Sequence, residues 1–490
     1  MNSLVNNTLW RTQLYINGEW RDADNKKQFS VVNPATGKII AHVADGGAIE
    51  TRCAIEAADN AQKQWKHLTV KARSTILRKW FDLVTKNQQD LAYILTCEQG
   101  KPLTEAQREV DYGASYIEWF SEEAKRIYGD VIAPQSNDKR AIILKQPVGV
   151  VATITPWNFP CAMLARKLAP ALAAGCTVVV KPAAQTPLSA LALAVLAEQA
   201  GVPAGVLNIV CGENAEAIGH ELTTHPLVRK LSFTGSTAVG KKLIQQCASS
   251  VKKVTMELGG NAPFIVFDDA DIDAAVHGAI ASKFRNSGQT CVCANRFYIH
   301  ADVYDQFVEK FSHEISQLVM GNGLDKATTL GPLISPEAVQ KVQHLVDDAL
   351  AKGAVKKDVG NFTLSENLAE EYFYPPTLLI NVPSTARICS EEIFGPVAAL
   401  IKFTTEQEVI SMANATEFGL AGYFYAQDMS RIWRVAEQLE VGMVGVNEGI
   451  LSNEMTPFGG VKQSGWGREG SHYGIEDYVN IKYMCIGNLT

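Results

Sequence analysis

One cysteine of this 490-residue sequence stands where it could act as a nucleophile. Cys291 lies in the segment SGQTCVCANR, which is rich in glycine and small polar residues and falls between an expected helix and an expected strand. Such a loop can expose a thiol and direct backbone N–H groups at an oxyanion. Free cysteines are also among the most buried residue types, so a structural role for Cys291 is the alternative.

A carboxylate and an amide could complete this chemistry. Glu257 closes an apolar strand-like segment and precedes a glycine pair, where α/β folds place catalytic groups. A half-buried glutamate can have a raised pKa and act as a general base. Asn158, in TPWNFP, follows an expected strand and could donate to an oxyanion. The alternatives are a solvent-facing glutamate at a strand end and an asparagine that merely suits a turn.

A phosphate site is indicated more strongly than a metal site. The segment SFTGSTAVG (232–240) follows an expected strand and opens an expected helix, the setting for phosphate at a helix N-terminus. It lacks the second glycine of G-x-G-x-x-G and is weak evidence alone. Cys291 and Cys293 have no matching Cys or His pair at metal-ligand spacing, so we expect no metal. The ten cysteines fit no disulfide framework.

The elements that must position these residues alternate regularly from about residue 148. Strands are expected at 148–154, 177–181, 206–210, 229–233 and 252–258, and helices at 162–175, 187–201, near 214–223 and near 237–248. Continuous apolar strands that alternate with helices indicate a parallel sheet covered on both faces.

A second alternation follows residue 258. Strands are expected at 263–267 and 296–300, and helices at 271–286, near 302–319 and at 336–352. This pattern predicts a second α/β unit. Residues 141–147 and 478–486 are β-prone but fit neither unit, and we expect them to pair into a small sheet that covers a neighbouring subunit.

Composition narrows the class of protein. Apolar residues make up 47% of the chain and charged residues 20%, which is typical of globular proteins and excludes disordered and collagen-like classes. The net charge of −7 disfavours a nucleic-acid partner. The first residues lack a signal-peptide core, and the longest apolar stretch, 190–197, is too short to span a bilayer. We therefore expect a cytoplasmic protein without a membrane partner.

Six motifs, spread in order from residue 155 to 396, resemble those of the aldehyde dehydrogenase superfamily. They are TPWNFP, KPAAQTP, SFTGSTAVG, MELGGN, GQTCVCANR and EEIFGP. The resemblance covers essentially the whole chain, from YINGEW (15–20) onward. Within the superfamily the chain looks most like bacterial succinate-semialdehyde dehydrogenases, through stretches such as EQGKPL (98–103) and KFRNSGQTCVCANR.

The resemblance implies an α/β fold with three parts. These are a parallel-sheet cofactor-binding domain, a second α/β catalytic domain and a small β oligomerisation element. We assign residues 1–128 and 148–258 to the cofactor-binding domain, 259–470 to the catalytic domain, and 129–147 and 471–490 to the oligomerisation element. The family implies a homotetramer or homodimer built through that element.

The resemblance also implies the oxidation of a small-molecule aldehyde. Cys291 would form a thiohemiacetal and then a thioester, Glu257 would activate the hydrolytic water, and Asn158 with the backbone N–H of Cys291 would hold the oxyanion. These roles agree with the chemistry expected from the residues alone. Cys293 would be a redox partner that forms a disulfide with Cys291 under oxidation, or else a packing residue.

A nicotinamide dinucleotide cofactor is implied as well. The implied cofactor-binding residues are Trp157, Lys181, Ala184, Gly235, Ser236, Leu258, Glu392 and Phe394. NAD-preferring relatives often carry Glu at position 184 and NADP-preferring ones Ser. Ala184 neither repels a 2′-phosphate nor hydrogen-bonds to it, whereas Lys181 would attract it. We expect NADP to be preferred and NAD to be usable.

The implied substrate is succinic semialdehyde, in 4-aminobutyrate degradation. Arg166, Arg285 and Ser452 match the family's carboxylate-binding residues, and arginine can hold a carboxylate with two parallel hydrogen bonds. Solvated or ion-paired arginines are the alternative. Glutarate semialdehyde is an alternative substrate, since one methylene is worth only about 1–3 kcal/mol. An inactive scaffold and a thiol hydrolase are the alternatives from other classes.

Overall fold

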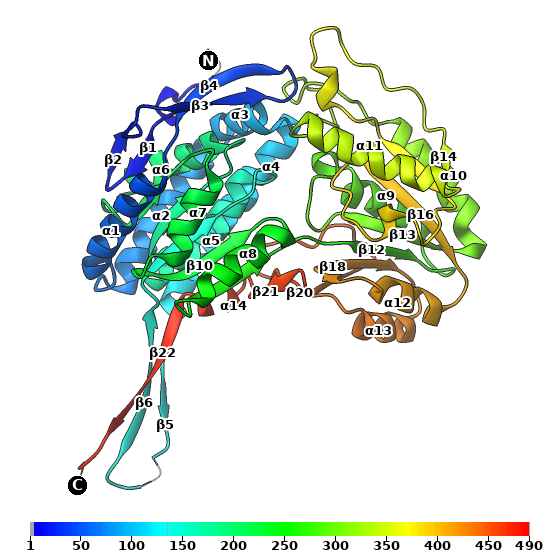
Figure 1. The fold of residues 1–490 in the computed structure, drawn as a ribbon. Coiled ribbons are helices and arrows are strands. Elements are labelled where there is room, and N and C mark those ends of the chain that lie inside the picture. The colour runs from blue at the N-terminus through cyan, green and yellow to red at the C-terminus, as the bar shows by residue number, and fades with distance from the viewer. Residues whose placement is uncertain (1–3, 135, 490) are drawn as a thin grey trace.

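The computed structural model describes residues 4–134 and 136–489, which form two large sheets covered by helices and a projecting arm (Figure 1). Figure 1 shows the first sheet and its helices, in blue to green, beside the second sheet and its helices, in green to orange. We call these the first and second lobes. Residues 1–3, 135 and 490, which fall in the ranges predicted for the cofactor-binding domain and the oligomerisation element, lie outside the described residues.

The first sheet has eight strands with a parallel centre. Its order is β2 (Glu19–Arg21), β1 (Leu14–Ile16), β9 (Leu207–Ile209), β8 (Thr177–Lys181), β7 (Val150–Ile154), β10 (Val228–Thr234), β11 (Lys253–Glu257) and β21 (Gly465–Trp466). The strands from β9 to β11 are parallel, as the sequence predicts. Strand β21 comes from the range assigned to the catalytic domain, yet it pairs with β11 in this sheet.

The first lobe has helices where the sequence predicts them, after residue 148, and further helices before that residue. They are α1 (Ala48–Trp65), α2 (Val70–Lys86), α3 (Gln88–Gln99), α4 (Leu103–Glu123), α5 (Pro160–Ala174), α6 (Pro187–Ala200), α7 (Ala215–Thr224) and α8 (Thr237–Ala248). Helices α5 and α6 both start with proline and end before a left-handed glycine, Gly175 and Gly201. Their apolar side chains pack into one core with the sheet.

The second sheet has seven strands. Its order is β14 (Val355–Lys357), β15 (Thr377–Ile380), β16 (Val397–Phe403), β13 (Ala294–His300), β12 (Ala262–Val266), β18 (Ala421–Tyr425) and β19 (Met443–Val446). Two apolar clusters lie on it, one with α9 (Ile272–Lys283) and α10 (Tyr304–Ser316), the other with α11 (Pro336–Ala351), α12 (Glu406–Asn414) and α13 (Met429–Gln438). The second α/β unit predicted from the sequence is therefore present.

One expected helix is too long. The prediction of a helix over 271–286 is wrong at its end, because α9 stops at Lys283 and Asn286 has a left-handed backbone. A left-handed residue cannot continue a right-handed helix. After α9 the chain therefore continues as the loop that carries Cys291.

The arm is a three-stranded antiparallel sheet at the first lobe (Figure 1). Its strands are β5 (Asp130–Ile132), β6 (Arg140–Pro147) and β22 (Val479–Ile486), and the predicted pairing of 141–147 with 478–486 is observed. Ile481 and Tyr483 on β22 are exposed. Short helix α14 (Tyr473–Glu476) precedes β22, and β3 (Gln28–Asn33) pairs with β4 (Lys38–Ala44), as β17 (Phe418–Gly419) does with β20 (Val461–Lys462). Within the described residues, no helix is both long and apolar enough to cross a membrane.

The pairing of β21 with β11 can be tested at Gly465, which lies opposite Glu257. Gly465 has a φ of +110°, and a Cβ there would lie 1.9 Å from the backbone oxygen of Met256. We expect Gly465→Ala to lower the unfolding temperature and activity, because β21 must move away from β11. The control is Gly201→Ala, which has a φ of +96° but no atom within 4 Å and should cost only backbone strain of about 1–2 kcal/mol. Equal stability and activity in the two variants would contradict this role of β21.

Candidate active site

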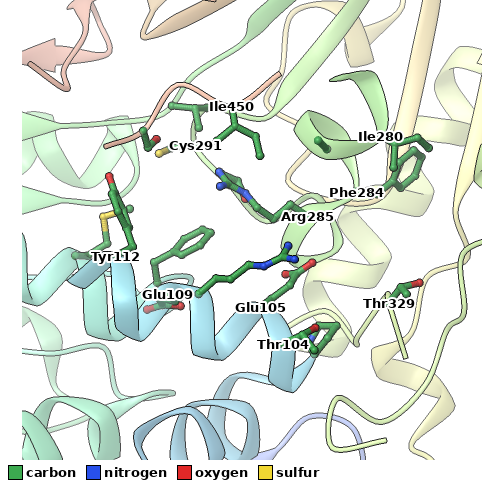
Figure 2. Close-up of a pocket in the computed structure, with 18 of the residues that line it drawn as sticks. Thr104, Glu105, Glu109, Tyr112, Ile280, Phe284, Arg285, Cys291, Thr329 and Ile450 are labelled. Atoms are coloured by element: carbon green, nitrogen blue, oxygen red, sulfur yellow. The ribbon is translucent and has the colours of Figure 1, made fainter. Parts of the chain in front are cut away.

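Two cavities meet at Cys291. The first cavity, of about 610 Å³, has walls from α4, α5 and α9, and the second, of about 570 Å³, lies against the ends of strands β7, β8, β10 and β11. Cys291 lines both. Figure 2 shows it at one end of the first cavity, with Arg285 farther along. A nucleophile in this position can reach groups bound on either side.

The structure brings most of the predicted site residues to these two cavities. The first is lined by Arg166, Arg285 and Ser452; the second is lined by Trp157, Asn158, Lys181, Ala184, Gly235, Ser236, Leu258, Glu392 and Phe394. Glu257 and Cys293 do not line either cavity. Both side chains are buried. The charge of Glu257 acts on Cys291, and Cys293 follows Cys291 by two residues in the sequence.

The loop before Cys291 is fixed by Asn286. Its φ of 50° lies in the left-handed region, which asparagine tolerates better than most residues. The Asn286 side-chain amide donates to the backbone oxygens of Asn158, at 3.0 Å, and Gln289, at 3.2 Å. Its side-chain oxygen accepts from Gln99 at 3.0 Å. Asn286 therefore ties the Cys291 loop to the turn that carries Asn158.

Asn158 is held so that part of its amide remains available. Its Nδ2 donates to the backbone oxygen of Gln289 at 3.1 Å, and its Oδ1 accepts from the backbone of Phe159 at 3.1 Å. An amide nitrogen carries two N–H groups, so one is left for a bound oxyanion. Lys101 holds the backbone oxygen of Asn158 at 2.8 Å and forms a buried ion pair with Glu109 at 2.5 Å.

The pKa values of Cys291 and Glu257 are both raised, chiefly by burial. Burial raises the pKa of the Cys291 thiol to about 12, against the effect of Arg166. Burial, and after it the charge of Glu469, raise the pKa of Glu257 well above that of an exposed glutamate, against Arg166 and Lys167. Neither carboxyl oxygen of Glu257 has a hydrogen-bond partner among the described residues. Such a group is free to take or release a proton, as a general base must.

The two predicted substrate arginines differ in their partners. Arg166 and Lys167 both form ion pairs with the buried Glu469, and the Arg166 guanidinium lies 4.1 Å from the ring centroid of Phe458. Arg285 is partly exposed and forms no ion pair with any residue that the structure describes. Arg285 is therefore the cation in this pair that can accept the charge of a ligand in the first cavity.

The second cavity suits a dinucleotide. Helix α8 begins at this cavity, and Ser236 caps it by accepting the Val239 N–H at 3.4 Å. The first N–H groups of a helix favour an anion such as a pyrophosphate. Lys181 is buried at the same cavity, and its Nζ donates to the Pro182 carbonyl at 3.2 Å without a carboxylate partner among the described residues. Ala184 contributes only a methyl group to the wall.

Glu392 and Phe394 form another part of the second cavity. Glu392 accepts the Gly260 N–H at 3.2 Å, and burial raises its pKa to about 7. Phe394 packs edge-on against Trp157, with 5.6 Å between the ring centroids. A carboxylate beside an aromatic wall can hydrogen-bond a ribose while the ring packs against a flat base. The residues present therefore fit a nicotinamide dinucleotide.

Cys293 faces away from the two cavities. Its thiol is buried and donates to the backbone oxygen of Lys283 at 3.4 Å, and both Cys291 and Cys293 are free thiols in this structure. A disulfide between them stays a prediction. Across residues 4–134 and 136–489, no group of three or more His, Cys, Asp or Glu side chains is placed to hold a metal ion.

Several residues that hold the active-site side chains in place are not predicted from the sequence. They are Lys101, Glu109, Lys167, Asn286, Gln289 and Glu469. Asn286 and Gln289 lie within the motif that surrounds Cys291, which was a usable signal. The buried charged residues gave no usable signal in the sequence, because the burial of a Lys–Glu pair is visible only in the folded structure.

Comparisons with known proteins agree with this geometry. The model of the aldehyde dehydrogenase family matches residues 20–484. The chain is 60% identical to a glutarate-semialdehyde dehydrogenase of Pseudomonas putida, over 98% of both chains, and 59% identical to an NADP-dependent succinate-semialdehyde dehydrogenase of Escherichia coli, over 99% of both. A solved NADP-dependent enzyme of Escherichia coli has a TM-score of 0.97 and 59% identity, covering 99% of this chain and 100% of its own.

The chain belongs to the aldehyde dehydrogenase family. It is an NAD(P)-dependent oxidoreductase that oxidises a small aldehyde. The fold predicted from the motifs is therefore confirmed.

The link between the Cys291 loop and Asn158 can be tested at Asn286. We expect Asn286→Ala to lower the free energy of unfolding by about 2 kcal/mol or more, because buried partners lose their hydrogen bonds. We also expect kcat to fall about tenfold or more, since Asn158 and Cys291 lose their common anchor. The control is Asn381→Ala, an exposed position with a similar φ of 53°. Equal losses in both variants would assign the effect to backbone strain alone.

Proposed function

We propose that this enzyme oxidises succinic semialdehyde to succinate with NAD(P)+. The observation that carries the proposal is the place of Cys291 between a cavity with the unpaired Arg285 and a cavity suited to a dinucleotide. The relatives are named for succinate or glutarate semialdehyde, which both carry a terminal carboxylate. An unpaired arginine in a partly closed cavity is a suitable partner for that carboxylate.

In the proposed reaction Cys291 attacks the aldehyde carbon and forms a thiohemiacetal. The free N–H of Asn158 and the backbone N–H of Cys291 hold the oxyanion. A nicotinamide bound in the second cavity would supply the acceptor for the hydride, and loss of that hydride from the substrate carbon would leave a thioester on Cys291. Lys181, Ser236 and Glu392 would hold the dinucleotide.

Glu257 completes the proposed cycle. In its ionised form it takes a proton from the thiol and later from the water that hydrolyses the thioester. Burial first, and then the charge of Glu469, raise the pKa of Glu257, while Arg166 and Lys167 lower it, so these charges adjust how readily that form appears.

The pH dependence of turnover follows from these pKa directions. Glu257 and Cys291 both have raised pKa values, so their active, ionised forms increase as pH rises. We expect kcat to rise between pH 6 and 9. We expect Glu257→Gln to lower kcat at least about 100-fold while a slower first burst of reduced cofactor remains, because hydrolysis needs the base whereas the thiol can also lose its proton to solvent. A wild-type kcat that falls over this range would contradict the assignment.

The substrate proposal is tested by replacing Arg285. A charged hydrogen bond is worth about 1.5–3 kcal/mol, so we expect Arg285→Gln to lower kcat/KM for succinic semialdehyde about 10–150-fold, chiefly through KM. Butanal, which has no carboxylate, is the control substrate and should be turned over nearly as before. Wild-type enzyme that prefers butanal to succinic semialdehyde would make this chain a general aldehyde dehydrogenase.

For the cofactor we propose a preference for NADP over NAD. Lys181 supplies a positive charge and Ala184 supplies no carboxylate at the second cavity. We expect Ala184→Glu to lower the NADP:NAD ratio of kcat/KM at least about tenfold, because like charges in contact cost several kcal/mol. Ala184→Gln is the neutral control of the same size. A wild-type ratio that already favours NAD would overturn the preference.

Three other candidate functions have less support. Glutarate semialdehyde keeps all of the chemistry and is the runner-up, and the relative from Pseudomonas putida favours it. An inactive scaffold is disfavoured by the intact set of Cys291, Glu257 and Asn158. A thiol hydrolase would need a partner histidine, and none lines the first or second cavity.

We propose the three-part division predicted above, a homotetramer or homodimer built through the arm, a cytoplasmic location and a role in 4-aminobutyrate degradation. The exposed apolar side chains of Ile481 and Tyr483 support the association of subunits, because isolated strands rarely expose such residues to water.

A further inference from the structure

The first cavity is larger than succinic semialdehyde requires. Its volume is about 610 Å³. Seven heavy atoms, at the roughly 30 Å³ that a water molecule occupies in the liquid, fill about 200 Å³. A substrate of this size leaves most of the cavity to water or to a longer molecule.

Helix α4 forms one wall of this cavity along its length. The cavity is lined by Glu105, Arg108, Glu109 and Tyr112. These are positions i, i+3, i+4 and i+7, which lie on one face of the helix. Figure 2 shows Tyr112 at the end that holds Cys291 and Thr104 at the other end. At 1.5 Å per residue, Arg108 lies about 6 Å along the helix axis from Tyr112, in the direction of Thr104.

Among the charged residues of this wall, only Glu109 forms an ion pair within the described residues. Glu109 forms its ion pair with Lys101, and Glu105 accepts the backbone N–H of Asn286 at 2.8 Å. Arg108 is exposed and forms no ion pair with any described residue. Arg108 and Arg285 thus both line this cavity without an ion pair, and the charges of both act on the carboxyl of Glu105.

We propose that Arg108 is a specificity-determining residue that binds the carboxylate of ω-carboxylated aldehydes with five or six carbons. This inference rests on the proposed function and extends it. Each methylene lengthens an extended chain by about 1.3 Å, given carbon–carbon bonds of about 1.5 Å. A longer substrate anchored at Cys291 thus carries its carboxylate farther along the cavity, past Arg285 toward Arg108.

The test compares succinic, glutaric and adipic semialdehyde with butanal on the wild-type enzyme and on Arg108→Gln. We expect Arg108→Gln to lower the ratio of kcat/KM for adipic over succinic semialdehyde at least fivefold, through KM rather than kcat. Arg108→Lys, which keeps the charge, should recover most of this ratio. Arg229→Gln, which removes one exposed arginine outside both cavities, is the control and should leave the ratio unchanged.

Two results would overturn the inference. One is a ratio that Arg108→Gln changes less than twofold. The other is an equal loss for all four aldehydes, butanal included, which would indicate structural damage. A wild-type enzyme that prefers butanal would instead contradict the proposed function itself, whatever Arg108→Gln does.

Discussion

A buried carboxylate between two cations sets the electrostatics of the active site. Glu469 forms ion pairs with Arg166 and Lys167 on α5, and all three side chains are almost wholly excluded from solvent. Buried charges are tolerated only when they are paired, so this contact fixes the C-terminal segment against α5 across 302 residues of sequence. The same charges act on Glu257: burial is the main cause of its raised pKa, Glu469 raises that pKa further, and Arg166 and Lys167 lower it.

The two lobes contribute different parts of the site, and polar contacts join them. The first sheet places Asn158 after β7 and Glu257 at the end of β11, where ligands of open parallel sheets bind. Cys291 comes from the loop between α9 and β13 of the second lobe. The Asn286 side chain links the Asn158 turn to the Cys291 loop, so one buried side chain positions both the nucleophile and the oxyanion donor.

The sequence indicates the local elements well because their signals are local. Pro160 and Gly175 bound α5, Ser236 caps α8, and apolar runs give the parallel strands. It does not indicate that Arg166 is already paired with Glu469, because that contact depends on how distant segments pack. For the same reason, the sequence cannot show that only one of the two expected substrate arginines, Arg285, is without an ion pair. It also does not indicate that Arg108 on α4 lines the same cavity.

The central claim is that Cys291 carries the acyl group between the two cavities. It is tested most directly by mixing the Glu257→Gln enzyme with succinic semialdehyde and NADP+, quenching in acid, and mapping the modified peptides by mass spectrometry. The account predicts a succinyl group on Cys291, formed only when the cofactor is present and in step with one reduced cofactor per active site. Reduced cofactor without acylated Cys291, or a succinyl group on another cysteine, would contradict it.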